Sequence, residues 1–279
     1  MSGRLVVCPT PIGNLEDVTL RVLSALREAD AVACEDTRRT RVLLERYGVS
    51  AKLVPYHEHN ERKRARELVE RMSGGETVAL VSDAGMPLIS DPGFVLVREC
   101  VAAGLPVEVL PGPSAAIAAL VASALPADSW RFAGFLPRKK GELRKLLSEP
   151  GGTLVAFESP RRVPATLALA AEVDPGREAV VARELTKAHE EVVRGTTAEL
   201  AERYGEAPPR GEVALVFGPT APAEPGEVAG LDALRRLVDA GAKPRPAAAV
   251  VAELTGGSAN ALYRALTRRK HPARPDARG

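Results

Sequence analysis

Val-Ser-Asp-Ala-Gly-Met-Pro-Leu-Ile-Ser-Asp-Pro-Gly, at residues 81–93, is the stretch that decides the fold of this chain. It follows an apolar segment, 77–81, that is typical of a strand, and it precedes a helical pattern at 94–103. A second turn, Pro-Gly-Pro-Ser-Ala-Ala at 111–116, also leads from a strand-like segment into a helical one. Such turns expose backbone at the ends of strands, which is where α/β folds bind ligands. The sequence therefore predicts an α/β fold with a ligand site at these two turns.

Neither turn has the sequence of a phosphate-binding loop. The first lacks Gly-x-x-x-x-Gly-Lys-Ser/Thr, and neither contains Gly-x-Gly-x-x-Gly. We therefore expect a ligand that is not held by its phosphates.

Strand and helix patterns alternate along the first part of the chain, which is predicted to form one domain over residues 1–125. Its strands are apolar without an alternation of polar residues, so they indicate a mostly parallel sheet that is covered on both faces. The expected strands are 4–9, 31–35, 52–55, 77–81 and 107–110, and the expected helices are 18–29, 38–47, 61–73, 94–103 and 114–124.

A second α/β domain is predicted over residues 126–218. It begins with a break at 126–140, and two consecutive strands later in the segment indicate a mixed sheet. The expected strands are 153–157, 179–183, 191–196 and 212–217, and the expected helices are 161–172 and 198–204.

A small helical module is predicted at 231–270, beyond a Pro- and Gly-rich linker at 218–230. Its expected helices are 231–240, 245–254 and 259–269, and Ser258 is a good N-cap for the last one. The pattern fits a helix-turn-helix that binds nucleic acid, and it fits a small three-helix cap about as well.

Charge is unevenly distributed along the chain. The whole chain has a formal net charge of +2, whereas residues 230–279 contain ten basic and four acidic side chains, or +6, which leaves about −4 elsewhere. A basic terminal module on a slightly acidic body predicts a polyanionic partner, although a solubilising tail would carry the same charge.

Composition also limits the class of protein. No segment approaches the roughly 20 uninterrupted apolar residues of a membrane span, and the N-terminus lacks a signal-peptide layout, so we expect a cytoplasmic protein. The three cysteines, Cys8, Cys34 and Cys100, lie far apart in apolar segments and are predicted to be buried thiols.

Polar clusters follow three of the predicted strands. Glu35-Asp36-Thr37-Arg38-Arg39 offers either a helix cap or a carboxylate for proton transfer beside guanidinium groups for phosphate. His57-Glu58-His59 lacks an obvious third metal ligand, so substrate contact or base catalysis is better supported and no metal site is predicted. Arg161 and Arg162 stand at a helix N-terminus, where an anionic ligand would offset the unfavourable helix dipole.

Seven motifs occur in order along the chain. They are Thr10-Pro11-Ile12-Gly13-Asn14-Leu15, Glu35-Asp36-Thr37-Arg38, the loop 82–93, Pro111-Gly112-Pro113-Ser114-Ala115, Phe157-Glu158-Ser159-Pro160-Arg161-Arg162, Arg183-Glu184-Leu185-Thr186-Lys187, and Gly211-Glu212-Val213. Together they resemble the ribosomal small subunit methyltransferase I family of the tetrapyrrole methylase superfamily. That family 2′-O-methylates a cytidine ribose in the decoding region of small-subunit (16S) ribosomal RNA. The segment around 242–246 is more proline-rich than the family pattern.

The resemblance implies a two-domain tetrapyrrole-methylase-like (class III methyltransferase) α/β fold with a small C-terminal helical module. It also implies a homodimer with S-adenosylmethionine in the cleft between the domains. A neutral-to-cationic cofactor agrees with strand-end loops of small residues that permit close backbone approach. The implied cofactor contacts are Pro11, Ser82, Asp83, Ala84, Gly85, Ser114, Ala115, Phe157, Leu185 and Val213.

Such an enzyme must align a ribose 2′-hydroxyl and receive its proton. Asp36 and Glu58 are the candidate bases, with His57 as the third. The partner would be small-subunit ribosomal RNA, either naked or in the assembled subunit. The alternatives are methylation of a small molecule such as a tetrapyrrole, and a non-catalytic ribosome assembly factor. The candidate RNA-binding residues are Arg38, Arg39, Arg161, Arg162, Arg264, Arg268 and Arg269.

Overall fold

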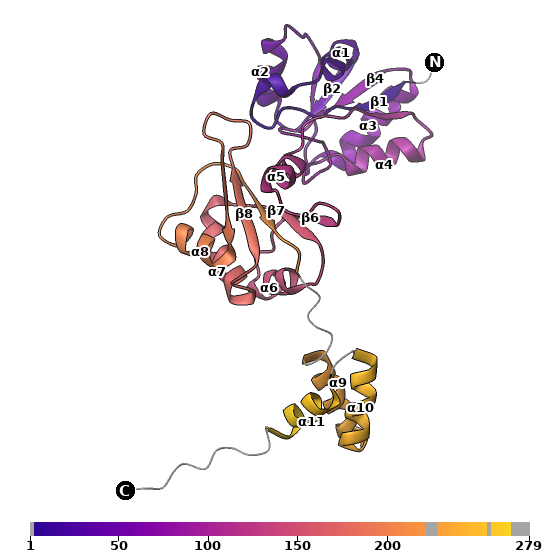
Figure 1. Cartoon of the computed structure of the whole chain (residues 1–279). Coiled ribbons are helices and arrows are strands. Elements are labelled where there is room, and N and C mark those ends of the chain that lie inside the picture. Colours follow the sequence, from indigo (N-terminus) through magenta and orange to yellow (C-terminus); the bar gives the residue numbers. More distant parts are fainter. Residues whose placement is uncertain (1–2, 221–227, 256–257, 269–279) are drawn as a thin grey trace. The chain divides into compact units, whose positions relative to one another are not determined.

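The computed structural model describes residues 3–220, 228–255 and 258–268 (Figure 1). These residues form two compact units. The first comprises the chain up to Ser148 together with Gly152–Pro219, and the second comprises Glu149–Gly151 with the chain from Thr220 onward. The first unit contains both sheets of the molecule.

The first sheet has five strands in the order β3-β2-β4-β1-β5, and every neighbouring pair is parallel. The predicted mostly parallel sheet is confirmed. Its strands are β1 (Arg4–Val7), β2 (Ala31–Cys34), β3 (Leu53–Pro55), β4 (Thr77–Leu80) and β5 (Val107–Val109). Its helices are α1 (Leu20–Glu28), α2 (Thr37–Arg46), α3 (Glu61–Ser73) and α4 (Phe94–Ala102), and a 3-10 turn, η1, spans Leu15–Asp17.

Helices cover both faces of this sheet, and successive side chains of each strand point to opposite faces. One face, which includes Val6 and Val32, packs against Leu26 of α1 and Leu43 of α2. The other face packs against α3 and α4. All three cysteines are buried and free, as expected.

The neighbouring strands β1 and β4 form the switch point of the sheet, where the order in which successive strands are added reverses. The helix that follows β1, α1, covers one face, whereas the helix that follows β4, α4, covers the other. The loops that leave these two strands therefore diverge and leave a crevice at the carboxyl end of the sheet. The loop at residues 81–93 begins there.

The second sheet is mixed, as predicted, with the strand order β6-β7-β10-β8-β9. Only β6 and β7 are parallel, and the other neighbouring pairs are antiparallel. Its strands are β6 (Trp130–Phe135), β7 (Thr153–Glu158), β8 (Glu178–Arg183), β9 (Glu191–Thr196) and β10 (Val213–Phe217). Its helices are α5 (Ala115–Ser123), α6 (Lys140–Ser148), α7 (Val163–Val173) and α8 (Thr197–Gly205), and a second 3-10 turn, η2, spans Pro160–Arg162.

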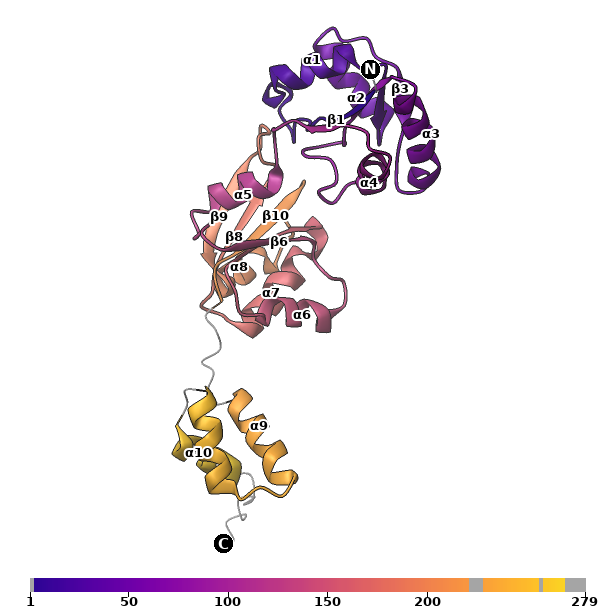
Figure 2. The same cartoon turned by 90° about the vertical axis from the view of Figure 1, so that its right-hand side faces the viewer.

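Helix α5 packs on the second sheet, although it directly follows the first sheet in the sequence (Figure 2). Its Ala116, Ala119 and Leu120 contact the face formed by side chains such as Val155 and Val216. Helices α6, α7 and α8 cover the opposite face. The small residues of α5 let it lie close to the strands that line the site described below.

The expectation of a structureless break at 126–140 is wrong, because β6 and the start of α6 occupy it. The strand is irregular: its register on β7 shifts between Phe132 and Phe135, where Gly134 adopts a φ of +64°. A bulge with flanking prolines hides the strand pattern in the sequence. Helix α6 begins within the basic run and was missed, although Leu143 and Leu147 mark its buried face.

The C-terminal unit is a three-helix cluster made of α9 (Val228–Asp239), α10 (Pro244–Thr255) and α11 (Ala259–Arg268). Its core includes Leu234, Val251 and Leu262. The Ser258 hydroxyl accepts a hydrogen bond from the amide of Ala261, so the predicted N-cap is confirmed. Within the described parts of the chain, no helix has both the length and the apolar character needed to cross a membrane.

Candidate active site

A cleft of about 450 Å³ is lined by residues that come from both sheets. One wall consists of loops that follow β1, β2, β4 and β5, and the other consists of the ends of β6, β7, β8 and β10 with the loops beside them. The lining residues used below are Ile12, Glu35, Arg39, Asp83, Ala84, Gly85, Asp91, Ser114, Ala115, Phe135, Phe157, Glu158, Leu185, Glu212 and Val213.

The loops after β1 and β4 are joined at the switch point of the first sheet. The amide of Thr10 donates to the carbonyl of Gly85 at 2.9 Å, and the amide of Gly85 donates to the carbonyl of Thr10 at 3.0 Å. The buried Ser82 hydroxyl donates to the same Gly85 carbonyl at 3.0 Å. Gly85 has a φ of +81°, and a Cβ at this position would lie 3.3 Å from Cγ2 of Ile12. The loop therefore presents its backbone to the cleft at a point where glycine is required.

Asp83 connects this loop to the loop after β2. Its Oδ1 accepts a hydrogen bond from the amide of Asp36 at 3.0 Å, and its Oδ2 lies 3.6 Å from Nε of Arg39. Asp36 itself is the N-cap of α2, since its carboxylate accepts from the amide of Arg38 at 2.8 Å. The side chain of Arg38 also donates to it, and these bonds hold the pKa of Asp36 at about 2.

The opposite wall carries two aromatic rings. Phe135 and Phe157 meet edge to face with ring centroids 5.7 Å apart, and Phe135 remains 64% exposed. The β6 bulge places Phe135 there, which is a frequent use of bulges beside functional sites. A Cβ on Gly134 would lie 3.4 Å from the Ser90 hydroxyl, so the bulge passes close to the loop 81–93.

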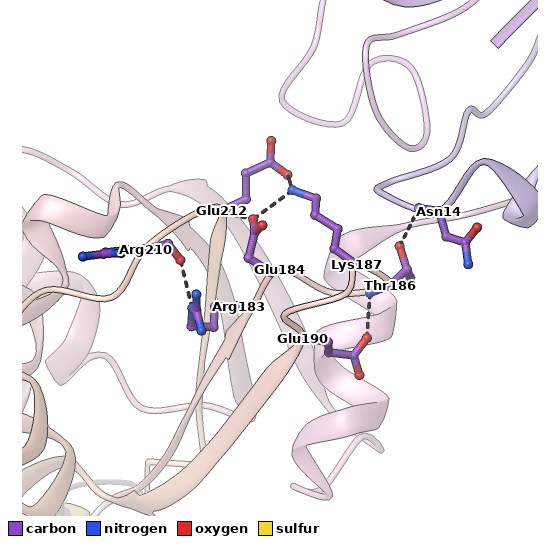
Figure 3. A network of polar contacts seen from close by, with 8 residues as sticks. All are labelled: Asn14, Arg183, Glu184, Thr186, Lys187, Glu190, Arg210 and Glu212. Carbon is purple, nitrogen blue, oxygen red and sulfur yellow. Dashed lines mark hydrogen bonds and ion pairs between the residues drawn. The ribbon is translucent and has the colours of Figure 1, made fainter. Parts of the chain in front are cut away.

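A polar network includes Glu212, one of the residues that line the cleft (Figure 3). The ammonium group of Lys187 donates to Oε1 of Glu184 at 2.9 Å and to Oε2 of Glu212 at 3.0 Å. The Thr186 hydroxyl accepts from the amide of Asn14 at 3.0 Å, which ties this loop to the loop after β1. The motif at residues 183–187 therefore holds the two walls together, while Leu185 lines the cleft.

Acidic side chains gather at the end of the cleft near the loop 81–93. Burial raises the pKa of the Asp91 carboxyl to about 7, and the negative charges of Glu35 and Asp83 add to the rise. Burial, and then the charge of Asp83, also raises the pKa of Glu35. The cleft therefore favours a cationic ligand over an anionic one.

Most of the predicted cofactor contacts lie at the cleft. Pro11 and Ser82 do not line it. Both are buried, and the Ser82 hydroxyl donates to the Gly85 carbonyl within the loop. Of the predicted RNA-binding arginines whose side chains the structure describes, only Arg39 lines the cleft. The predicted cofactor contacts that line the cleft are Asp83, Ala84, Gly85, Ser114, Ala115, Phe157, Leu185 and Val213.

The three candidate bases lie outside the cleft lining. Asp36 caps α2. Glu58 is exposed, and His57 is half-buried with its Nε2 3.1 Å from Nδ2 of Asn60. Among the described residues, no group of three or more His, Cys, Asp and Glu side chains is arranged to hold a metal ion.

The remaining arginines take different positions. Arg162 donates to the carbonyls of Leu136 and Pro137, and its Nη1 lies 3.3 Å from Oε1 of the buried Glu158. Glu158, rather than an external anion, thus offsets the charge of Arg162. Arg38, Arg161 and Arg264 are exposed. Arg268 ends α11, and Arg269 lies outside the described residues.

Several residues of the cleft were not named from the sequence as site residues, among them Asp91, Glu35 and Phe135. Asp91 lies within the loop that decides the fold, but its burial beside two other carboxylates depends on how distant loops pack. Phe135 lies in the segment expected to be a break.

The cleft fits a sulfonium cofactor. Its loops have glycine where a side chain would obstruct the backbone, its apolar walls include aromatic rings, and its carboxylates match a positive charge. Small residues at Ala84, Ser114 and Ala115 leave room for a ligand along the first wall.

Comparisons with known proteins agree with this architecture. The profile of the family described as Tetrapyrrole (Corrin/Porphyrin) Methylases matches residues 4–201. A ribosomal RNA small subunit methyltransferase I from Mesorhizobium japonicum is 48% identical over 268 residues, which cover 94% of this chain and 90% of the relative. One from Thermotoga maritima is 45% identical over 217 residues, which cover 77% of this chain and 98% of the relative.

The fold is also shared with a solved uroporphyrin-III C-methyltransferase from Thermus thermophilus in complex with S-adenyl homocysteine. That structure aligns with a TM-score of 0.55 and 22% identity, over 77% of this chain and 97% of the other. The match confirms the predicted fold class. With the family profile and the close relatives above, it follows that this chain belongs to the tetrapyrrole methylase family and, within it, to the ribosomal RNA small subunit methyltransferase I family.

Proposed function

We propose that the protein uses S-adenosylmethionine to methylate small-subunit ribosomal RNA, at the 2′-hydroxyl of a cytidine in the decoding region. The observation that carries the proposal is the cleft, in which glycine-containing loops and carboxylates suit a sulfonium ligand and no phosphate-binding loop is present. The names of the close relatives favour ribosomal RNA over a tetrapyrrole as the substrate. Labelled methyl transfer from S-adenosylmethionine to small subunits that lack the modification tests it.

The cofactor would be held by the residues that both the sequence and the cleft indicate. Gly85 and Ala84 would offer backbone on one wall, Ser114 and Ala115 would flank it, and Phe157, Leu185 and Val213 would form the apolar wall. When bound, S-adenosylmethionine supplies a methyl group on a sulfonium centre. The chain must then hold the ribose hydroxyl in line with that group and take up its proton.

The target nucleotide must leave its stack to reach the cleft, because the site is recessed between two walls. We propose that its base stacks on Phe135, the exposed aromatic ring of the cleft lining. Phosphates would stay at the rim of the cleft, near the exposed side chains of Arg39 and Arg38, since the carboxylates within the cleft would repel them. The chain thus separates the anionic backbone of the RNA from the cationic centre of the cofactor.

Phe135→Ala is expected to weaken transition-state binding of the RNA by about 1–3 kcal/mol, the value of one base stacked on an aromatic side chain. Cofactor affinity should stay unchanged. Single-turnover kcat/KM on small subunits, with calorimetry of cofactor binding, measures both. Phe94→Ala is the matched control, because Phe94 is 63% exposed and does not line the cleft. Loss of cofactor affinity with unchanged use of RNA would instead place the ring against the cofactor.

The C-terminal unit is proposed to dock RNA and to take no part in the chemistry. The Thermotoga maritima relative is matched over 98% of its length by 77% of this chain, so that relative lacks a counterpart of the remaining part. The basic side chains of residues 230–279, Arg264 among them, supply the +6 charge that suits a polyanion.

Deletion of residues 230–279 is therefore expected to weaken binding to small subunits and to flatten its salt dependence. Each phosphate contact that is lost should reduce the slope of log K against log salt by roughly 0.7, the single-strand value. Titrations of full-length and shortened protein at several salt concentrations measure the slope, and calorimetry checks that cofactor affinity is unchanged. Equal affinity and slope for the two proteins would make the segment a solubilising appendage.

We also propose that the protein is cytoplasmic, since its proposed substrate is ribosomal, and that it forms a homodimer. Exposed apolar side chains on one helix of the first unit, Ile117 and Val121 of α5, support a self-association surface.

A further inference from the structure

The proposed reaction requires a proton acceptor, because a ribose 2′-hydroxyl keeps its proton at neutral pH. The acceptor must reach the hydroxyl inside the cleft, directly or through one water molecule. This requirement rests on the proposed function. The carboxylates that line the cleft are Glu35, Asp83, Asp91, Glu158 and Glu212.

Three of these five carboxylates are already engaged by other groups. Glu158 accepts from the amide of Ser159 and the hydroxyl of Thr166, and it pairs with Arg162. Glu212 is bound to Lys187 at 3.0 Å. Asp83 accepts from the amide of Asp36 and faces Arg39. Each of them has a structural role that a proton would disturb.

The other two, Asp91 and Glu35, form no ion pair with a lysine or arginine of the described residues, whereas Arg38 lies 2.8 Å from Asp36 and Arg39 lies 3.6 Å from Asp83. Arg39 and His57 do act on Glu35 through their charge, whereas the charged groups that act on Asp91 are carboxylates. Asp91 is therefore the cleft carboxylate with the least positive surroundings.

The backbone around Asp91 is held in an unusual conformation. Leu88 and Ser90 have φ values of +74° and +67°, which side chains other than glycine rarely adopt. Gly93, which follows at a φ of +142°, packs where a Cβ would lie 2.7 Å from Cδ1 of Leu88. Strain of this kind persists where surrounding structure fixes a side chain, and it collects at functional sites. Here it fixes the segment that carries Asp91 at the edge of the cleft.

We propose that Asp91 is the catalytic residue that accepts the proton of the ribose 2′-hydroxyl. In this step the O2′ proton passes to the Asp91 carboxylate and a bond forms between O2′ and the methyl carbon. The bond between that carbon and the cofactor sulfur breaks, and the electron pair stays on sulfur. Glu35 and Asp83 act on Asp91 through their charge and touch no reacting atom in this scheme.

The surroundings of Asp91 suit this role at neutral pH. Burial, with the charges of Glu35 and Asp83, raises the pKa of Asp91 to about 7, and a hydrogen bond with Ser82 works in the opposite direction. A general base is most effective when its pKa lies near the working pH. The basic groups that act on this cluster through their charge are Arg38 and Arg39 on Asp83, and Arg39 and His57 on Glu35.

Asp91→Asn should lower the single-turnover methylation rate on small subunits by about 10²- to 10⁴-fold, with cofactor affinity changed only a few-fold. In the wild type the rate should rise with pH through a limb near pH 7 and then level off, because the ionised carboxylate is the active form. Asp128→Asn changes an exposed residue outside the cleft and is the matched control. It should leave the single-turnover rate and its pH dependence unchanged. If Asp36→Asn or Glu58→Gln removes the limb and Asp91→Asn does not, the proposal is overturned.

Glu35→Gln provides a second test in which Asp91 is intact. Removal of the Glu35 charge should lower the pKa of Asp91 and shift the limb to lower pH. Carbon-13 NMR titration of Asp91 in the protein without cofactor gives a readout that is independent of activity. A titration near pH 4, or an unshifted limb, would overturn the proposal.

Thermal unfolding supplies a further readout. Because the pKa of Asp91 is raised in the folded state, its contribution to stability is lost as pH rises from about 4 to about 7. Asp91→Asn should therefore have a higher melting temperature than the wild type at pH 8, and the difference should be much smaller at pH 5.

A wild-type protein without any transfer to small subunits would overturn the proposed function itself, whereas wild-type transfer with an unimpaired Asp91→Asn variant would overturn only the role of Asp91.

Discussion

Gly85→Val is expected to abolish S-adenosylmethionine binding, with a Kd raised by at least about 100-fold, or about 2.8 kcal/mol. Gly85 has a φ of +81°, which a β-branched residue adopts only with strain of order 1–3 kcal/mol. A Cβ would also lie 3.3 Å from Cγ2 of Ile12, which lines the cleft, and the two γ-methyl groups would add further bulk to this crowded point. Relief of this crowding would break the pair of hydrogen bonds that joins Gly85 to Thr10. Calorimetry with S-adenosylmethionine measures the loss.

Gly104→Val separates backbone strain from a direct effect on the cleft. Gly104 has a φ of +69°, a Cβ added to it would meet no neighbouring group within 4 Å, and it does not line the cleft. This variant should lose stability through strain but bind cofactor normally. Equal losses of affinity in the two variants would show that general destabilisation, and not the loop at Gly85, controls binding.

Much of the fold could be predicted because its elements carry local signals. The helix Glu61–Ser73 and the strand Glu191–Thr196 have the predicted bounds, since hydrophobic periodicity and flanking turn residues mark both. The edge strand β6 had no such signal. Its pairing shifts at a bulge around Gly134, and parallel pairing with β7 depends on a strand more than fifteen residues later. Helix α5 follows the first sheet in sequence but packs on the second, because its apolar residues contact side chains of β7, β8 and β10. These contacts are tertiary and have no local signal in the sequence.

The candidate site was predictable where the backbone forms it and less so where side chains act. The loops at Gly85 and Ser114 lie at strand ends, as their glycine, proline and small residues indicated. Asp36 and Asp91 both lie in segments that connect a strand to a helix, yet one caps a helix with its pKa lowered to about 2 while the other has its pKa raised to about 7. Hydrogen bonds and burial decide between these outcomes, and both depend on residues far along the chain.

Glu158→Ala is expected to lower the free energy of unfolding by about 3 kcal/mol, the lower end of the range for breaking a buried ion pair. The side chain of Glu158 is fully buried, whereas Arg162 keeps 30% exposure and so retains part of its hydration. Removal of the carboxylate also leaves the Thr166 hydroxyl and the Ser159 amide without their acceptor. These groups fix the end of β7 and the turn that follows it, both of which line the cleft. Urea denaturation at neutral pH measures the change.

Glu172→Ala is the matched control, since Glu172 also pairs with basic side chains, Arg144 and Lys140, but on the surface. Exposed pairs contribute little, so this variant should lose only a small fraction of the stability lost in Glu158→Ala. Glu158→Gln should fall between the two, because an amide oxygen still accepts hydrogen bonds but leaves Arg162 without a counter-charge. If Glu158→Ala and Glu172→Ala cost the same, the Glu158 cluster is no stronger than a surface pair. The charge of Arg162 would then be satisfied by the Leu136 and Pro137 carbonyls alone.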